Sequence, residues 1–145
     1  MSHSRTIAVV CSALEQLLAT TLREPNAVFE LAEEIADHPN GIQAVGLLLS
    51  LLERSDKLDW GTPGPVVHAV EKFFNGGYES LLLESVGRAP TSHTLWMVNR
   101  VINGIPHHEQ GQFLSALRQA ATRPDVSEEV RQTALDFLEF QQANA

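Results

Sequence analysis

Apolar residues recur with the period of an α-helix along nearly the whole chain, and the two-residue alternation of an amphipathic strand is absent. The pattern predicts eight helices, separated by short turns rich in glycine, proline and asparagine. The expected helices span about residues 4–22, 25–38, 42–54, 65–74, 78–86, 91–103, 107–121 and 124–141. We therefore expect an all-α protein.

The turns between these helices are short, which predicts antiparallel neighbours in consecutive pairs. Each pair would span about 35–40 residues, a length typical of HEAT-like helical repeats. No repeat is visible residue by residue, so the period is one of element lengths only. The sequence favours a right-handed stack of α-hairpins, with a compact helical bundle as the alternative. A chain of 145 residues fits one helical domain, residues 1–145.

The chain is acidic, with 18 acidic and 10 basic residues and a formal net charge of −8. The excess is concentrated between Glu24 and Asp59. This stretch contains eight acidic residues and only two basic ones, Arg54 and Lys57. No basic stripe is present, so direct binding of nucleic acid is not expected. Charge alone leaves two interpretations open, a basic partner or acidity that merely keeps the protein soluble.

Four of these carboxylates share one face of the second expected helix. They follow the i, i+3, i+4, i+7 spacing: Glu30, Glu33, Glu34 and Asp37. The opposite face is apolar and is expected to point into the core through Val28, Leu31, Ala32 and Ile35. Like charges at this spacing each cost a few tenths of a kcal/mol. A helix that keeps four of them is therefore a candidate binding face.

Motifs of the common enzyme classes are absent from the sequence: a nucleophile elbow, a P-loop, a dinucleotide glycine fingerprint and a zinc-protease helix. The lone Cys11 excludes a disulfide framework and is expected to be a buried, inert thiol. His107 and His108 are adjacent and would point about 100° apart on a helix, so they cannot chelate one metal together. We expect no catalytic residue, metal or cofactor.

The apolar run at residues 7–14 is too short for a signal peptide or a membrane span. We therefore expect a cytoplasmic protein without a membrane partner.

Two groups of polar residues nevertheless have spacings that could serve chemistry. His68 and Glu71 share one helix face and could act as a base with its orienting carboxylate, but a structural hydrogen bond is favoured. The other group lies along one side of the sixth helix: Trp96, Asn99, Arg100 and Asn103. It could anchor a partner, but a partly buried structural network is favoured. We assign both groups to structural polar contacts.

The middle of the chain resembles a known family. The residues that carry the resemblance are Trp60-Gly61, the run His68–Phe73, Tyr78 with Leu81-Leu82, and the run Trp96–Asn103. In order and spacing they are similar to the immunity-protein-thirty family of bacterial polymorphic toxin systems, of which contact-dependent growth inhibition is one. The resemblance covers about residues 60–104, under a third of the chain.

The resemblance implies a small, all-helical cytoplasmic protein that binds the C-terminal domain of one cognate toxin and neutralises it by stoichiometric occlusion. Such toxins are often nucleases, either RNases or DNases, with basic surfaces for phosphate groups. The family-like residues lie in a segment without net charge, so they are expected to specify the fold. The acidic stretch would then choose the partner, through Glu30, Glu33, Glu34, Asp37, Asp56, Asp59 and Trp60. Trp60 could equally be an interface anchor or a core residue.

Two other functions remain open. The first is a HEAT-like adaptor that binds an ordinary protein. The second is a small hydrolase that uses His68 and Glu71.

Overall fold

The computed structural model describes residues 5–19, 26–54, 61 and 64–144. Within these ranges the chain forms eight α-helices and one short 3-10 helix, and no strand. In chain order they are α1 (Ile7–Leu18), α2 (Asn26–Ala36), α3 (Ile42–Leu52), α4 (Pro65–Glu71), α5 (Tyr78–Arg88), α6 (Ser92–Gly104), η2 (His107–Glu109), α7 (Gly111–Thr122) and α8 (Glu128–Ala143). The prediction of an all-α protein with about eight helices is confirmed for this part of the chain.

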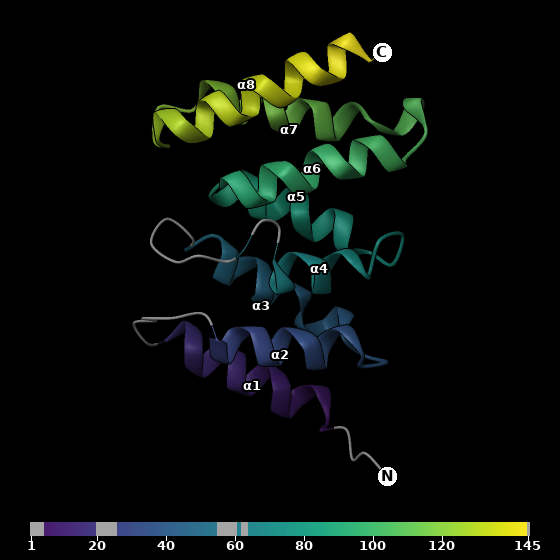
Figure 1. Ribbon diagram of the computed structural model, residues 1–145, viewed down its shortest axis with the longest axis vertical. Coiled ribbons are helices and arrows are strands. Elements are labelled where there is room, and N and C mark those ends of the chain that lie inside the picture. Colours follow the sequence, from purple (N-terminus) through teal and green to yellow (C-terminus); the bar gives the residue numbers. More distant parts are fainter. Residues whose placement is uncertain (1–4, 20–25, 55–60, 62–63, 145) are drawn as a thin grey trace. The chain divides into compact units, whose positions relative to one another are not determined.

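By its internal contacts the chain divides into two compact units, residues 1–81 and 82–145, with the division inside α5. The helices of the first unit run alternately in opposite directions (Figure 1). Its most extensive packing joins α1 to α3 and α2 to α4. This is the pattern expected when the hairpin α1/α2 stacks on the hairpin α3/α4. The single domain over residues 1–145 stays a prediction.

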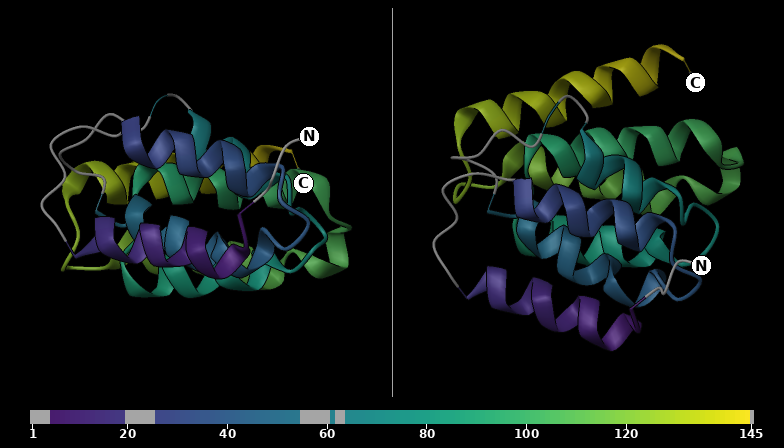
Figure 2. Two further views of the ribbon diagram at one scale, coloured as in Figure 1. Left: turned by 90° about the horizontal axis from the view of Figure 1, so that it is seen from below. Right: turned by 60° about the horizontal axis from the view of Figure 1, so that its bottom comes forward.

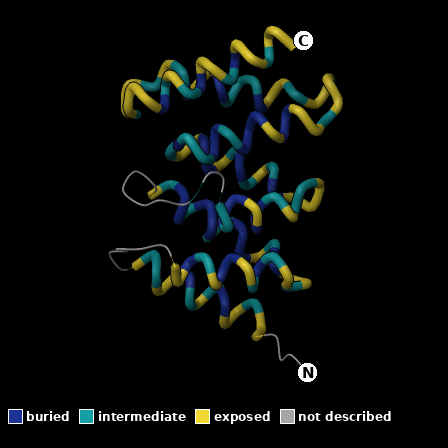
Figure 3. The backbone as a smooth tube through the Cα atoms, viewed as in Figure 1, coloured by how far each residue is buried: buried dark blue, intermediate teal, exposed yellow. Residues whose placement is uncertain are grey.

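The central element of the first unit is α3, which is largely apolar. Six of its eleven residues are buried: Ala44, Val45, Leu48, Leu49, Leu51 and Leu52. Truncation of a buried leucine of this kind to alanine typically costs about 2 to 5 kcal/mol. Along the neighbouring helices, buried and exposed positions alternate with the helical period (Figure 3).

The second unit contains α6, α7 and α8, which run in alternating directions (Figures 1 and 2). Its α6 begins at a reciprocal cap formed by Thr91 and Thr94. The Thr91 hydroxyl accepts a hydrogen bond from the Thr94 amide at 3.2 Å, and the Thr94 hydroxyl accepts one from the Thr91 amide at 3.0 Å. Two backbone donors at the start of the helix are thereby satisfied, in a site that is buried.

Several helix ends differ from the prediction. The first helix begins at Ile7, because Thr6 is its N-cap, and α4 ends at Glu71. The expected helix over 107–121 is interrupted: His107 and His108 lie in the 3-10 turn η2, and α7 begins at Gly111. The Gln110 amide holds this turn by donating to the Ile102 carbonyl at 2.9 Å. Pattern reading places a helix end only to within a few residues.

Candidate functional site

The acidic face of α2 consists of the four carboxylates that the sequence singled out, Glu30, Glu33, Glu34 and Asp37. The opposite side of α2 is buried, as predicted, through Val28, Leu31, Ala32 and Ile35. Glu30, Glu33 and Asp37 are exposed, and Glu34 is partly buried. Burial of the apolar side thus turns the carboxylates outward.

The acidic face is divided between two different surroundings. Because successive residues on a helix are about 100° apart, Glu34 lies on one edge of the face and Glu33 and Asp37 on the other, with Glu30 between them. Glu34 faces Arg5, and Glu33 and Asp37 face α4. The spacing in the sequence predicted one face but not this division.

Arg5 binds Glu34 through two hydrogen bonds. Its Nε donates to one carboxylate oxygen at 2.9 Å and its Nη2 to the other at 2.5 Å. The hydrogen bond from Arg5 lowers the pKa of Glu34 below its usual value. His38, which follows α2, holds the Arg5 backbone as well. Its Nε2 lies 2.8 Å from the Arg5 carbonyl oxygen, and its Nδ1 accepts from the Asn40 amide at 2.9 Å.

Acidification is therefore expected to remove the stabilisation that the Arg5–Glu34 pair provides. The folded-state pKa of Glu34 is lowered from 4.5, so the contribution is present above about pH 4.5 and is lost as the pH falls through the lowered pKa. Urea denaturation of the wild type and Glu34→Gln between pH 7 and 3 should show a smaller loss of stability in the variant. The matched control is Glu30→Gln, which removes a carboxylate of the same helix that has no ion pair with a described residue. Equal pH dependence in the wild type and Glu34→Gln would contradict the assignment.

An open groove lies between α2 and α4, with a volume of about 440 Å³. Its polar side chains are Glu33 and Asp37, in α2 and directly after it, and His68 and Lys72, in α4 and directly after it. The other residues that line it are small or compact: Ala32, Ala36, Gly64, Pro65 and Ala69. These residues let α2 and α4 pack closely while leaving a recess between the charged side chains.

A weak ion pair spans the groove. The Lys72 ammonium lies 3.8 Å from an Asp37 carboxylate oxygen, and both side chains are mostly exposed. Exposed pairs of this kind contribute about 0 to 1 kcal/mol, because water screens them and ordering two long side chains costs entropy. Glu33 lines the groove on the same side as Asp37, and it has no ion pair with any described residue.

His68 and Glu71 were assigned to structural polar contacts, with a base and its orienting carboxylate as the alternative. His68 lines the groove with Glu33 and Asp37, whereas Glu71 is not among the residues that line it. Among the described residues that line the groove, none carries a hydroxyl or thiol nucleophile. The chemistry that the groove offers is that of carboxylates, one imidazole and one ammonium group.

Three of the predicted binding residues, Asp56, Asp59 and Trp60, lie outside the described residues. Nothing further is assigned to them, so their role at an interface stays a prediction.

The polar residues of α6 form two separate contacts. The Arg100 guanidinium lies 4.7 Å above the centre of the Trp96 ring, and Arg100 is exposed. Asn99 and Asn103 both accept hydrogen bonds from the Gln141 amide nitrogen, at 2.7 and 2.9 Å. The last helix was expected to end at about residue 141. Gln141 lies inside α8, which continues to Ala143.

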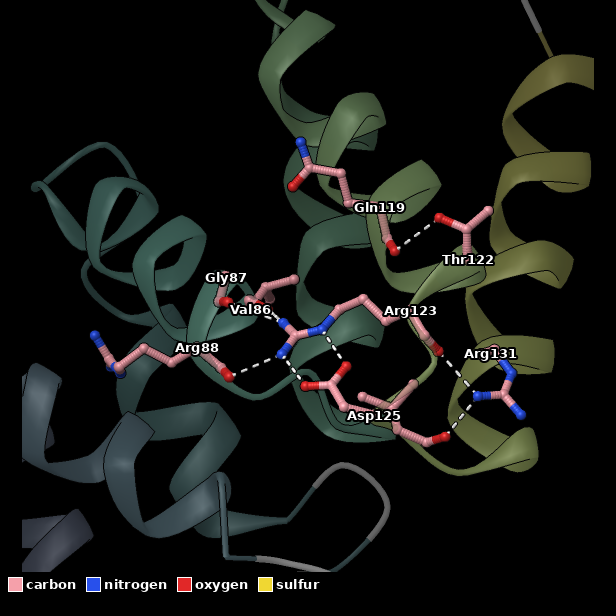
Figure 4. Close-up of polar contacts among 9 residues, drawn as sticks. Val86, Gly87, Arg88, Gln119, Thr122, Arg123, Asp125 and Arg131 are labelled. Atoms are coloured by element: carbon pink, nitrogen blue, oxygen red, sulfur yellow. Dashed lines mark hydrogen bonds and ion pairs between the residues drawn. The ribbon is translucent and has the colours of Figure 1, made fainter.

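A third cluster, around Arg123, was not predicted at all (Figure 4). Its guanidinium donates to the carbonyls at the C-terminal end of α5, those of Val86 at 3.4 Å, Gly87 at 2.8 Å and Arg88 at 3.2 Å. The same group binds Asp125 at 2.9 and 2.6 Å, and this hydrogen bonding lowers the pKa of Asp125. Arg131 in turn donates to the Arg123 carbonyl at 2.9 Å.

These contacts form a structural site. The last carbonyls of a helix have no partner within the helix, and Arg123 supplies donors to three of them. Arg123 therefore joins the end of α5 to the turn between α7 and α8.

Cys11 is partly buried rather than fully buried as expected. Burial is the main cause of the increase in the pKa of its thiol, and the nearby Glu15 carboxylate adds to it. Both effects disfavour the thiolate, which agrees with the expectation of an inert thiol.

In the described ranges, no group of three histidine, cysteine, aspartate or glutamate side chains is placed to hold a metal ion. None of the helices in those ranges is long and apolar enough to span a membrane.

Comparison of the chain with protein-family models, with curated proteins and with solved structures gave no match. The resemblance of residues 60–104 to immunity proteins therefore stays a prediction from the sequence.

Proposed function

We propose that the protein is an immunity protein that binds the C-terminal domain of a cognate toxin, a basic nuclease, and neutralises it by stoichiometric occlusion. The observation that carries the proposal is the exposure of Glu30, Glu33 and Asp37 on one side of α2 in a chain of net charge −8. A nuclease active site is positively charged, because it must bind phosphate groups. An acidic helix face is complementary to such a surface and would accelerate association.

The division of the acidic face indicates which carboxylates already have an ion pair within the described residues. Glu34 already binds Arg5, and Asp37 is close to Lys72. Glu30 and Glu33 have no ion pair with a described residue, so their charge is available to a partner without loss of an internal contact. An interface of roughly 800 Å² per partner is sufficient for a stable complex. Protection of a cell requires a Kd of about nanomolar or lower, or roughly −12 kcal/mol.

The direct test is co-purification with the C-terminal domain encoded by the gene immediately upstream, followed by association kinetics. For Glu30→Lys/Glu33→Lys we expect the association rate at low salt to fall by about tenfold or more, and its salt dependence to weaken. The matched control is Asp136→Lys/Glu139→Lys, which makes the same charge change at exposed positions of α8. We expect the control to change the rate by less than about threefold.

Two outcomes would overturn the proposal. One is a failure of the upstream-encoded domain to bind the wild-type protein or to lose its nuclease activity on binding. The other is an equal effect of the two double variants, which would make the α2 carboxylates part of a general solubilising charge.

A further inference from the structure

We infer that the groove between α2 and α4 is a receptor for an arginine side chain of the basic partner, and that Lys72 occupies the position of that cation in the free protein. The inference rests on the proposed function and deepens it, because it names the contact that gives specificity. It differs from a general attraction to the acidic face in requiring Glu33 and Asp37 but not Glu30.

The geometry of the groove fits a guanidinium group. Glu33 and Asp37 are four residues apart on α2, so their Cβ atoms are about 6 Å apart and both carboxylates border the same recess. A guanidinium presents five N–H donors in a planar fork and can donate to two carboxylates at once. The compact residues beneath them, including Ala32 and Ala69, leave an apolar floor for the aliphatic stem of an arginine.

The size of the groove is consistent with an inserted side chain. Its volume of about 440 Å³ lies within the range of ligand-binding clefts, about 300 to 1,000 Å³.

Lys72 already places a positive charge at the edge of the groove. Its ammonium nitrogen lies 3.8 Å from an Asp37 carboxylate oxygen, and this distance and the exposure of both side chains are typical of a weak ion pair. An entering arginine would replace a single long contact with shorter, charge-assisted hydrogen bonds. Lys72 therefore competes with the partner, and removal of its charge should strengthen binding of a basic ligand. A general acidic surface would gain much less from a change at this one position.

The experiment uses the full-length ¹⁵N-labelled protein and a defined probe, an acetylated, amidated Gly-Arg-Gly-Arg-Gly peptide. The matched peptide has citrulline in place of both arginines, which keeps the shape and removes the charge. We expect the arginine peptide to shift backbone amide signals of residues 32–37 and 64–72, and the citrulline peptide to shift none of them. Shifts spread evenly over all exposed carboxylates would overturn the inference.

Three variants distinguish binding in the groove from general attraction to the acidic face of α2. Glu33→Gln should weaken peptide binding by about tenfold, which is the loss expected for charge-assisted hydrogen bonds. Glu30→Gln removes the same charge from the same helix outside the groove and should weaken binding by less than about twofold. Lys72→Gln should strengthen it by roughly two- to fivefold. A melting temperature for each variant controls for folding.

Equal effects of Glu33→Gln and Glu30→Gln, or weaker binding in Lys72→Gln, would contradict the inference. These failures are distinct from failure of the proposed function. If the upstream-encoded domain binds and both glutamine variants weaken it equally, the groove is not the receptor and the proposed function stands. If the domain does not bind, the proposed function fails and the peptide titration still decides the groove.

Discussion

Replacement of Gly41 by alanine is expected to destabilise the first unit by about 3 kcal/mol, near the upper end of the usual cost of overpacking. Gly41 is buried in the turn between α2 and α3. A Cβ atom at this position would overlap the Ile35 carbonyl oxygen and would lie 2.6 Å from the Phe73 ring. The obstacle at Ile35 is backbone, so the end of α2 itself would have to move.

The control is Gly46→Ala, a chemically identical change five residues further along. Gly46 lies inside α3, and apart from its chain neighbours and the backbone of its own helix, no described atom comes within 4 Å of the position that its Cβ would take. Alanine is favoured over glycine inside a helix by about 1 kcal/mol, so this variant should be more stable than the wild type. Urea denaturation followed by circular dichroism measures both. A Gly41→Ala variant as stable as the wild type would show that the turn at Gly41 is not tightly packed.

The sequence predicted the role of Gly41 only in part. It marked residues 38–41 as the end of a helix, since proline, asparagine and glycine cluster there. The close approach depends on Phe73, which is 32 positions away along the chain. Helical periodicity reports which face of a helix is buried, but it carries no information about which distant residue covers that face.

The same limit applies to the candidate site. The spacing of the α2 carboxylates and their exposure could be predicted, because both follow from the helical period. The pairing of Glu34 with Arg5 could not, since 29 positions separate them and Arg5 precedes the first helix. The contact of Gln141 with Asn99 spans 42 positions and was missed for the same reason. Only the tertiary structure shows that one edge of the acidic face pairs with Arg5 while the other edge borders the groove.

A second large effect is expected in the second unit, residues 82–145. Arg123→Ala should lower the free energy of unfolding of this unit by about 2 to 3 kcal/mol. A hydrogen bond from a charged donor contributes about 1.5 to 3 kcal/mol, and the loss of the donors leaves helix-terminal carbonyls unsatisfied. Only 24% of the Arg123 side chain is exposed, so water replaces these contacts incompletely. The ion pair with Asp125 is more exposed and is expected to add little.

Two variants test whether the effect comes from the hydrogen bonds at the end of α5. Arg118→Ala removes the same side chain from an exposed position of α7 and should change the stability by less than about 0.5 kcal/mol. Arg123→Lys keeps the charge but replaces the planar fork with a single ammonium group, so it should recover only part of the loss. Full recovery with lysine would mean that charge alone matters, through its interaction with the helix end. Hydrogen exchange of the amides in α5 and in the α7–α8 turn, measured for all three variants, should show faster exchange in Arg123→Ala at both places, because one guanidinium joins them.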